Sequence, residues 1–164
     1  MPSLLVVISD ATPLIALSKI KQLHYLADLF DTIYVPQAVY DEITVSGKGR
    51  SGAQEIAQAS WIIVRKIEDK SRVEYLLTQL DIGEAEAIVL AQEVNAGLLL
   101  VDERKARAVA QRLGFNVIGT VGLLLLLKEQ GKISRIRPLL DKLRSLNFRL
   151  SERVYNQVIS QANE

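Results

Sequence analysis

The chain is 164 residues long and 49% of them are hydrophobic, which is enough to fill the core of one domain. It has no cysteine, which excludes disulfides and thiolate metal sites and fits a reducing cytoplasm, its expected location. The net charge of +1 gives by itself no argument for nucleic-acid binding, and the leucine run 123–127 is far shorter than the roughly 20 residues that span a membrane.

Short apolar runs alternate with helical segments along the chain. Continuous apolar runs bounded by polar residues are typical of strands buried on both faces, so this alternation predicts a three-layer α/β/α fold with a central parallel sheet. We expect residues 1–164 to form a single domain that ends in a basic helical segment from about residue 131. The predicted strands are 4–10, 32–35, 61–64 (at an edge of the sheet), 97–102 and 115–119, and the main predicted helices are 13–20, 22–29, 36–43, 71–79, 82–95, 103–113, 120–129, 134–146 and 151–162.

Two of the predicted strands end in an aspartate, Asp10 and Asp102. Parallel strands present their carboxyl ends at the same edge of a sheet, where open α/β sheets bind ligands. Two carboxylates about 5 Å apart there would repel by roughly 3 kcal/mol at an effective dielectric constant of about 20, which calls for a cation or a raised pKa. Taken singly, Asp10 also suits a turn before a helix that Thr12 caps, and Asp102 suits a helix N-terminus.

Glu84 is a third candidate, in the first turn of the predicted helix 82–95. Asp81 and Glu84 have the spacing of a capping box, which is a purely structural explanation for both. The rest of this helix is apolar almost all round, however, and such helices are buried, so a carboxylate in its first turn belongs at the sheet edge. Glu86 lies on a different face of the helix and is the alternative to Glu84 as the third acid.

Glu42 is a fourth candidate, because it follows Ala38 and Val39 by four and three residues and so lies beside the buried stripe of its helix. Its neighbour Asp41 lies further round, toward solvent. A surface position is the competing interpretation for either acid.

Basic residues could hold a phosphate chain near this edge. Arg104, Lys105 and Arg107 follow Asp102 on one predicted helix, where Arg107 could instead pair with an acid of the site. Residues 128–153 carry eight lysines and arginines against three acids, but such a run more often forms the solvated face of amphipathic helices. Two further candidates, Lys48 and Arg50, lie in the glycine-rich loop 46–52.

Five segments together resemble the PIN-domain proteins, and in particular the compact prokaryotic branch that includes toxins of toxin–antitoxin pairs. They are VISDATPLIALSKI, VPQAVYDEI, LDIGEAEAIVLA, LLLVDERKARAVA and GFNVIGTVGLLLLLKEQGKI, and their order and spacing extend the resemblance from about residue 6 to residue 160. Related toxins usually have aspartate as the third acid, so glutamate at position 84 departs from the pattern. Asp81 and Glu86 therefore remain alternatives for the third acid. A Ser or Thr near the first aspartate is also usual, and Ser9 and Thr12 are the candidates.

The resemblance implies an α/β/α fold and a metal-dependent endoribonuclease with a catalytic quartet of Asp10, Glu42, Glu84 and Asp102. Asp10, Glu84 and Asp102 are the expected metal ligands. Four oxygen donors without a useful Cys or His suit Mg²⁺ or Mn²⁺ rather than zinc. The resemblance also implies an RNA substrate, a small antitoxin partner and a homodimer. The alternative is a catalytically inactive module of the same fold that binds RNA or protein.

Overall fold

The computed structural model of the protein describes residues 5–164, so the start of the predicted strand 4–10 lies outside the described part. The strands are β1 Val7–Ser9, β2 Ile33–Pro36, β3 Ile62–Arg65, β4 Leu98–Leu100 and β5 Val117–Ile118. The helices are α1 Ala11–Lys19, α2 Tyr25–Phe30, α3 Gln37–Asp41, the π-helix η1 Glu42–Ser46, α4 Ala53–Gln58, α5 Lys70–Leu76, α6 Ile82–Glu93, α7 Arg104–Arg112, α8 Thr120–Glu129, α9 Arg137–Ser145 and α10 Glu152–Gln161.

The strands form one parallel sheet in the order β3-β2-β1-β4-β5, which confirms the predicted architecture and the edge position of β3. From β1 the chain builds outward through β2 and β3, then returns to the other side of β1 with β4 and β5. The strand order therefore reverses between β1 and β4, the position where open α/β sheets form their ligand crevice. Ser9 pairs in register with Leu100, so the carboxyl ends of these two strands lie side by side.

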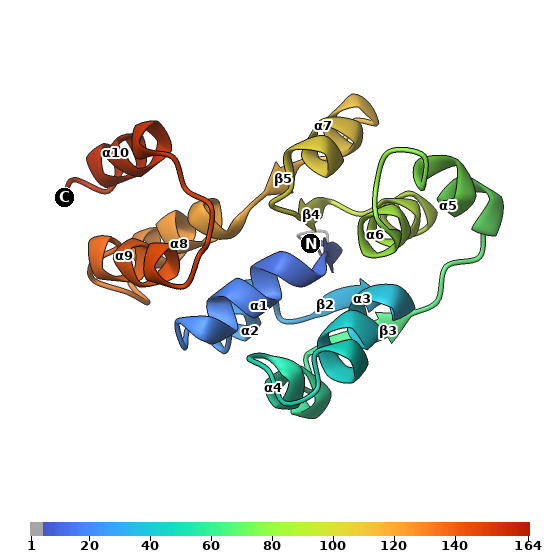
Figure 1. The fold of residues 1–164 in the computed structure, drawn as a ribbon, viewed down its shortest axis with the longest axis horizontal. Helices are drawn as coiled ribbons and strands as arrows, with labels where there is room; N and C mark the ends of the chain where they lie inside the picture. Colours follow the sequence, from blue (N-terminus) through green and yellow to red (C-terminus); the bar gives the residue numbers. More distant parts are fainter. Residues whose placement is uncertain (1–4) are drawn as a thin grey trace.

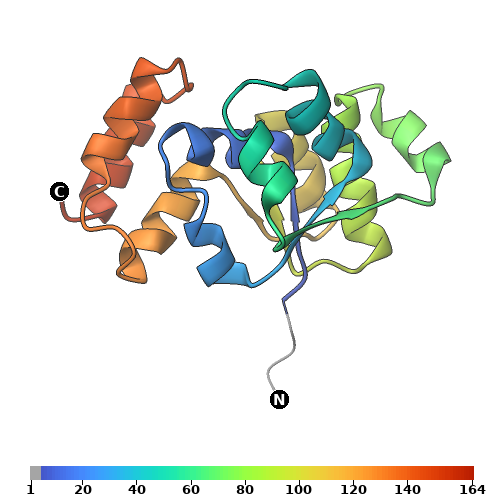
Figure 2. The ribbon, with the colours of Figure 1, turned by 90° about the horizontal axis from the view of Figure 1, so that it is seen from below.

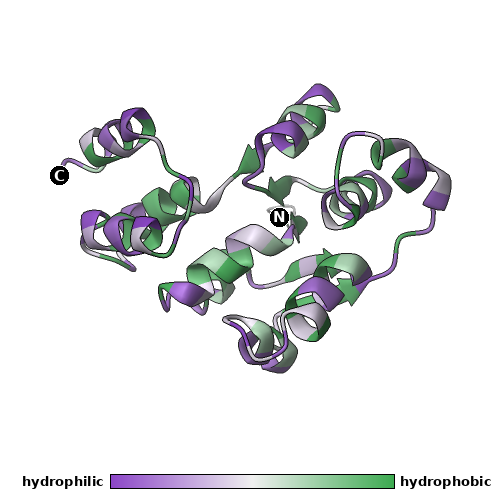
Figure 3. Cartoon of the chain, viewed as in Figure 1, coloured by the Kyte–Doolittle hydropathy of each residue, from purple (hydrophilic) through white to green (hydrophobic). Residues whose placement is uncertain are grey.

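Helices cover both faces of the sheet (Figures 1 and 2). Neighbouring residues of a strand point to opposite faces. On β1, Val7 therefore belongs to the core beneath α1, α8, α9 and α10, whereas Ile8 belongs to the core beneath α5, α6 and α7. The strands and α8 are the most consistently apolar elements, and polar residues lie on the outer helices (Figure 3). Within residues 5–164, no helix is both long enough and apolar enough to cross a membrane.

The first helix begins two residues earlier than the capping pattern predicts. Asp10, not Thr12, is the N-cap of α1, and Pro13 is the third helical residue. Proline is tolerated there because the backbone N–H groups of the first turn have no partner within the helix. The side chain of Asp10 makes no capping hydrogen bond.

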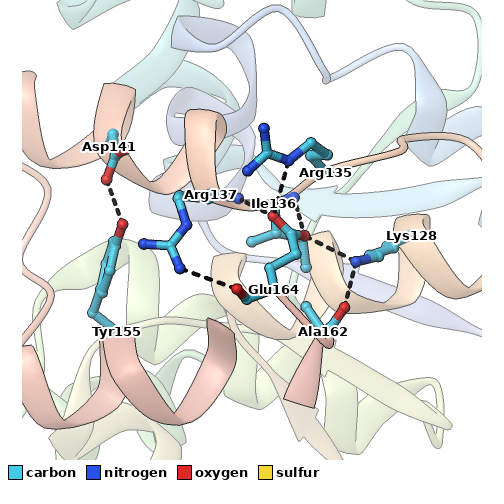
Figure 4. Close-up of polar contacts among 8 residues, drawn as sticks. All are labelled: Lys128, Arg135, Ile136, Arg137, Asp141, Tyr155, Ala162 and Glu164. Atoms are coloured by element: carbon cyan, nitrogen blue, oxygen red, sulfur yellow. Dashed lines mark hydrogen bonds and ion pairs between the residues drawn. The ribbon is translucent and has the colours of Figure 1, made fainter. Parts of the chain in front are cut away.

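Part of the basic segment that begins at Lys128 fastens α9 and α10 to α8. Glu164 accepts hydrogen bonds from the backbone N–H groups of Ile136 (2.6 Å) and Arg137 (3.1 Å), and its carboxylate pairs with Lys128 at 2.9 Å. Figure 4 shows this network, together with the longer pair between Arg135 and Glu164. Burial opposes ionisation of Glu164, but these contacts outweigh it and lower its pKa to about 2. The network holds the N-terminus of α9 against the end of α10.

We expect Glu164→Ala to destabilise the protein by about 1–3 kcal/mol at neutral pH, because it removes several charge-assisted hydrogen bonds at once. Because the pKa of Glu164 is depressed in the folded protein, this contribution is present above pH 4.5 and falls away as the pH drops toward 2. Urea unfolding at pH 7 and pH 3 measures it. Glu129→Ala, at an exposed carboxylate of α8, is the control, and an equal loss in the control would contradict the assignment.

Candidate active site

Asp10 is a buried carboxylate at the carboxyl end of β1. Only 5% of its surface is exposed, and its backbone N–H donates to Leu100 O at 2.9 Å, which fixes it beside the end of β4. Burial raises its pKa from 3.8 to about 8; the backbone N–H of Ala11 offsets part of that rise, and the charges of Glu84, Asp81 and Glu42 add to it. No cation among the described residues forms an ion pair with it. Asp10 is thus a carboxyl group held in an acidic, desolvated position.

Glu42 reaches the same position from the other side of β1. It lies where α3 continues into η1, a π-helical turn of the kind often found at functional sites. Contrary to the prediction, Glu42 is exposed and its neighbour Asp41 is half-buried, yet partial burial and the charge of Asp81 raise the pKa of Glu42. A Cβ added at Gly83 would lie 3.3 Å from Glu42 Oε1 and 3.4 Å from Asp10 Oδ1, so both carboxylates face the small space above this glycine. This juxtaposition is the most specific feature of the site.

Glu84 borders the same space from the first turn of α6. It forms the predicted capping box: its backbone N–H donates to Asp81 Oδ1 at 2.8 Å, and its Oε1 accepts from the N–H of Asp81 at 3.0 Å. The side chain is nonetheless buried, and burial, followed by the charges of Asp81, Glu103 and Glu42, raises its pKa against the opposing backbone hydrogen bond. The capping explanation is therefore confirmed, and because the cap occupies only one carboxylate oxygen, Glu84 stays a candidate for the site.

Asp102 also lies at this edge, but its carboxylate is engaged with the start of α8. Its Oδ1 accepts from the N–H of Thr120 at 2.8 Å and its Oδ2 from the hydroxyl of Thr120 at 2.6 Å. Burial raises the pKa of Asp102, while Thr120 and the nearby guanidinium of Arg107 lower it. Arg107 itself donates to Val101 O at 3.2 Å. A Cβ at Gly119 would come within 2.6 Å of Asp102 Oδ1, so glycine is needed for this approach.

Replacing Thr120 should change the ionisation of Asp102 directly. In Thr120→Val the hydroxyl hydrogen bond is lost, so we expect the pKa of Asp102 to rise further and the protein to lose about 1–3 kcal/mol of stability at neutral pH. Carboxyl NMR titration measures the pKa, and Thr120→Ser, which retains the hydroxyl, is the matched control. An unchanged Asp102 titration in the valine variant would show that this hydrogen bond does not hold the carboxylate.

The donor set suits a hard divalent cation in its chemistry, since it consists of carboxylate oxygens without a sulfur or imidazole ligand. Asp10 and Glu42 face a space that a methyl group would fill, which is where a cation would relieve their repulsion. Within residues 5–164, however, no three acidic or histidine side chains stand arranged to hold an ion as they are. Binding would require Glu84 or Asp102 to turn part of its carboxylate toward this space.

Of the other predicted residues, two make hydrogen bonds within the fold and the rest are exposed. Glu86 accepts from the N–H of Ala38 at 3.0 Å and thereby caps α3. The buried hydroxyl of Ser9 donates to Asp10 O at 2.8 Å. Thr12 is exposed and lies with Asp102 on the wall of a cleft. Lys48 and Arg50 are exposed in the turns after η1, and Lys105 is exposed on α7.

Sequence reasoning missed Gly83, Thr120 and Glu103. Glu103 is the N-cap of α7 and adds its charge to the environment of Glu84. Thr120 had a usable signal, since a residue at the start of a helix that follows a predicted strand belongs at the same sheet edge as Asp102. Gly83 had none, because the space above it exists only once α3, α6 and β1 are packed together.

Comparison with known proteins gives one finding. The sequence profile of the PIN domain matches residues 6–164, nearly the whole chain. PIN domains are generally metal-dependent nucleases. Curated protein sequences give no significant match.

Proposed function

This chain belongs to the PIN-domain family, and we propose that it is a divalent-metal-dependent endoribonuclease that hydrolyses RNA phosphodiester bonds. The observation that carries the proposal is the pair Asp10 and Glu42, two carboxylates that face one small space at the topological switch point. Carboxylates in such an arrangement are held at a cost unless a cation binds between them. The fold therefore maintains, at its ligand-binding edge, an electrostatic arrangement suited to a cation.

In this proposal each residue of the site has a defined role. Asp10 and Glu42 would hold the cation, and Glu84 and Asp102 would supply further oxygen donors or position a water molecule. Bound Mg²⁺ or Mn²⁺ supplies a water of lowered pKa and neutralises charge that develops on the phosphate. Thr120 holds Asp102 in place, and Arg107 beside it contributes a positive charge next to the reacting phosphate.

RNA cleavage in Mg²⁺ or Mn²⁺ tests the proposal. We expect the wild type to cut RNA, EDTA to abolish cutting, and Asp10→Asn and Asp102→Asn each to lower the rate by at least about 100-fold, as loss of a metal-positioning group does. Asp31→Asn, at an exposed aspartate after α2, is the control. Activity retained in both active-site variants would contradict the mechanism.

The alternative is a module of the same fold that binds RNA or protein without cleaving it. It is favoured by one observation, the absence among residues 5–164 of three acids already arranged around an ion. A metal titration separates the two, because a nuclease centre binds Mn²⁺ through Asp10 and loses this binding in Asp10→Asn. A wild type that binds RNA but neither binds Mn²⁺ nor cleaves would support the module.

We further propose that the protein is the toxin of a toxin–antitoxin pair. It would act as a homodimer in the cytoplasm and be inhibited by a small antitoxin. This proposal is supported by the resemblance of the five sequence segments to such toxins. Induced expression should then arrest growth of a bacterial host, and Asp10→Asn should not. Normal growth with soluble, RNA-cleaving wild type would contradict the toxin role and leave the nuclease activity in place.

A further inference from the structure

A cleft of about 1280 Å³ runs from Asp102 to the C-terminal hairpin of α9 and α10. Three helices line it with a repeat of i, i+3, i+4 and i+7, which places each set on one helix face. On α1 the set begins at Thr12 and ends at Lys19, which corresponds to about 10 Å along the axis. The other two sets are Arg104, Arg107, Ala108 and Gln111 on α7, and Val154, Gln157, Val158 and Gln161 on α10.

Three cations of this cleft are free to bind a ligand, whereas Arg107 donates to Val101 O. Lys19, Arg104 and Arg149 are exposed, and none of them has an ion-pair partner within 4.0 Å among residues 5–164. In lacking a polar partner among these residues, Arg149 differs from most basic residues of the segment 128–153. Five of the eight basic residues there already contact partners within the chain: Lys128, Lys132, Arg135, Arg137 and Arg144. The charge that remains available at the cleft is therefore positive, apart from Asp102 and Glu103 at its inner end.

The rest of the lining combines apolar side chains and amides. Phe148 and Leu125 are half-buried, and Val154 is 40% exposed. Gln111 and Asn147 supply exposed amides that can both donate and accept hydrogen bonds. Proteins that bind single-stranded nucleic acids combine a basic groove with apolar or aromatic surfaces on which bases lie. The cleft is larger than the usual range for a small-molecule site, about 300–1000 Å³.

We propose that this cleft holds a single-stranded stretch of RNA leading to the acidic site, with Lys19, Arg104 and Arg149 on its phosphates and its bases against Phe148 and Val154. The inference rests on the proposed RNA cleavage for the identity of the ligand. Asp102 lies on the wall of the cleft, so a strand bound there passes beside this carboxylate. A duplex would present only its backbone, because its bases are stacked and paired and cannot reach the apolar wall.

Binding measured without metal tests the cleft independently of catalysis. Fluorescence anisotropy in EDTA follows wild-type protein on a labelled single-stranded RNA of about 12 nucleotides. We expect Arg149→Glu and Lys19→Glu each to weaken binding by about 10-fold and to lower the slope of log K against log salt by about 0.7 for each lost phosphate contact. Arg153→Glu is the matched control, because Arg153 is an exposed arginine of the same hairpin that does not line the cleft.

A second measurement uses the wild type alone, so its result does not depend on whether the variants fold. RNA that contains 4-thiouridine should crosslink, in the wild type, to peptides from the loop 147–151 and from α10. If the wild type cleaves RNA but neither charge reversal weakens RNA binding, the proposed role of the cleft is contradicted while the nuclease activity stands. Crosslinks to other parts of the chain would contradict it in the same way. Wild type that never cleaves but binds RNA through Arg149 would overturn the nuclease and support the cleft. Equal affinity for a duplex of the same sequence would also overturn the cleft.

Discussion

Asp10→Asn should make the metal-free protein more stable at alkaline pH. Folded Asp10 keeps its proton up to about pH 8, whereas the unfolded chain releases it near pH 3.8. Between these values the folded protein binds more protons, so its free energy of unfolding falls as the pH rises, by about 1.4 kcal/mol per unit for one proton. Asparagine stays neutral, so the variant lacks this slope. It should gain up to about 6 kcal/mol over the wild type by pH 9 and almost nothing at pH 4.

Urea unfolding in EDTA at pH 4, 7 and 9 measures this difference. Glu129→Gln makes the same change from carboxylate to amide at an exposed site of α8 and should show no such gain. Adding Mn²⁺ should reverse the order, since a bound ion stabilises the wild type and not the variant. Parallel stability curves for the wild type and Asp10→Asn from pH 4 to pH 9 would show that Asp10 is not held in an unfavourable environment.

Gly83→Ala should remove activity without removing stability. Its new Cβ would lie 3.3 Å from Glu42 Oε1 and 3.4 Å from Asp10 Oδ1, in the space that the proposed cation needs. The same change favours helix formation in α6 by up to about 1 kcal/mol, because alanine replaces glycine within the helix. We expect cleavage to fall by at least about 100-fold and Mn²⁺ affinity to fall with it, while the midpoint of urea unfolding stays or rises.

Gln92→Ala, near the far end of the same helix, is the control and should leave cleavage unchanged. The two readouts separate a blocked site from a damaged fold, because a general loss of structure would lower stability and activity together. Wild-type cleavage by a folded Gly83→Ala would show that the space between Asp10 and Glu42 is not where an ion acts.

Much of this architecture could be predicted from sequence because its signals are local. The continuous apolar runs that end at Asp10 and Asp102 indicated buried parallel strands, and β1 and β4 are neighbours in the sheet. The apolar helix behind Glu84 indicated burial, and the capping box between Asp81 and Glu84 is present. Where propensities competed, local reasoning was wrong by two residues, as at Thr12, because backbone geometry rather than side-chain preference places the N-cap at Asp10.

By itself the sequence determined the parallel sheet and the gathering of acids at its carboxyl edge, since both follow from periodicities of a few residues and from the direction of parallel strands. Only the tertiary structure decided how each carboxylate is used. Packing of α3 and α6 on β1 turns Glu42 and Asp10 toward Gly83, whereas the start of α8 binds Asp102 and the start of α3 binds Glu86. These choices depend on contacts between segments far apart in the chain, and no spacing within one segment encodes them.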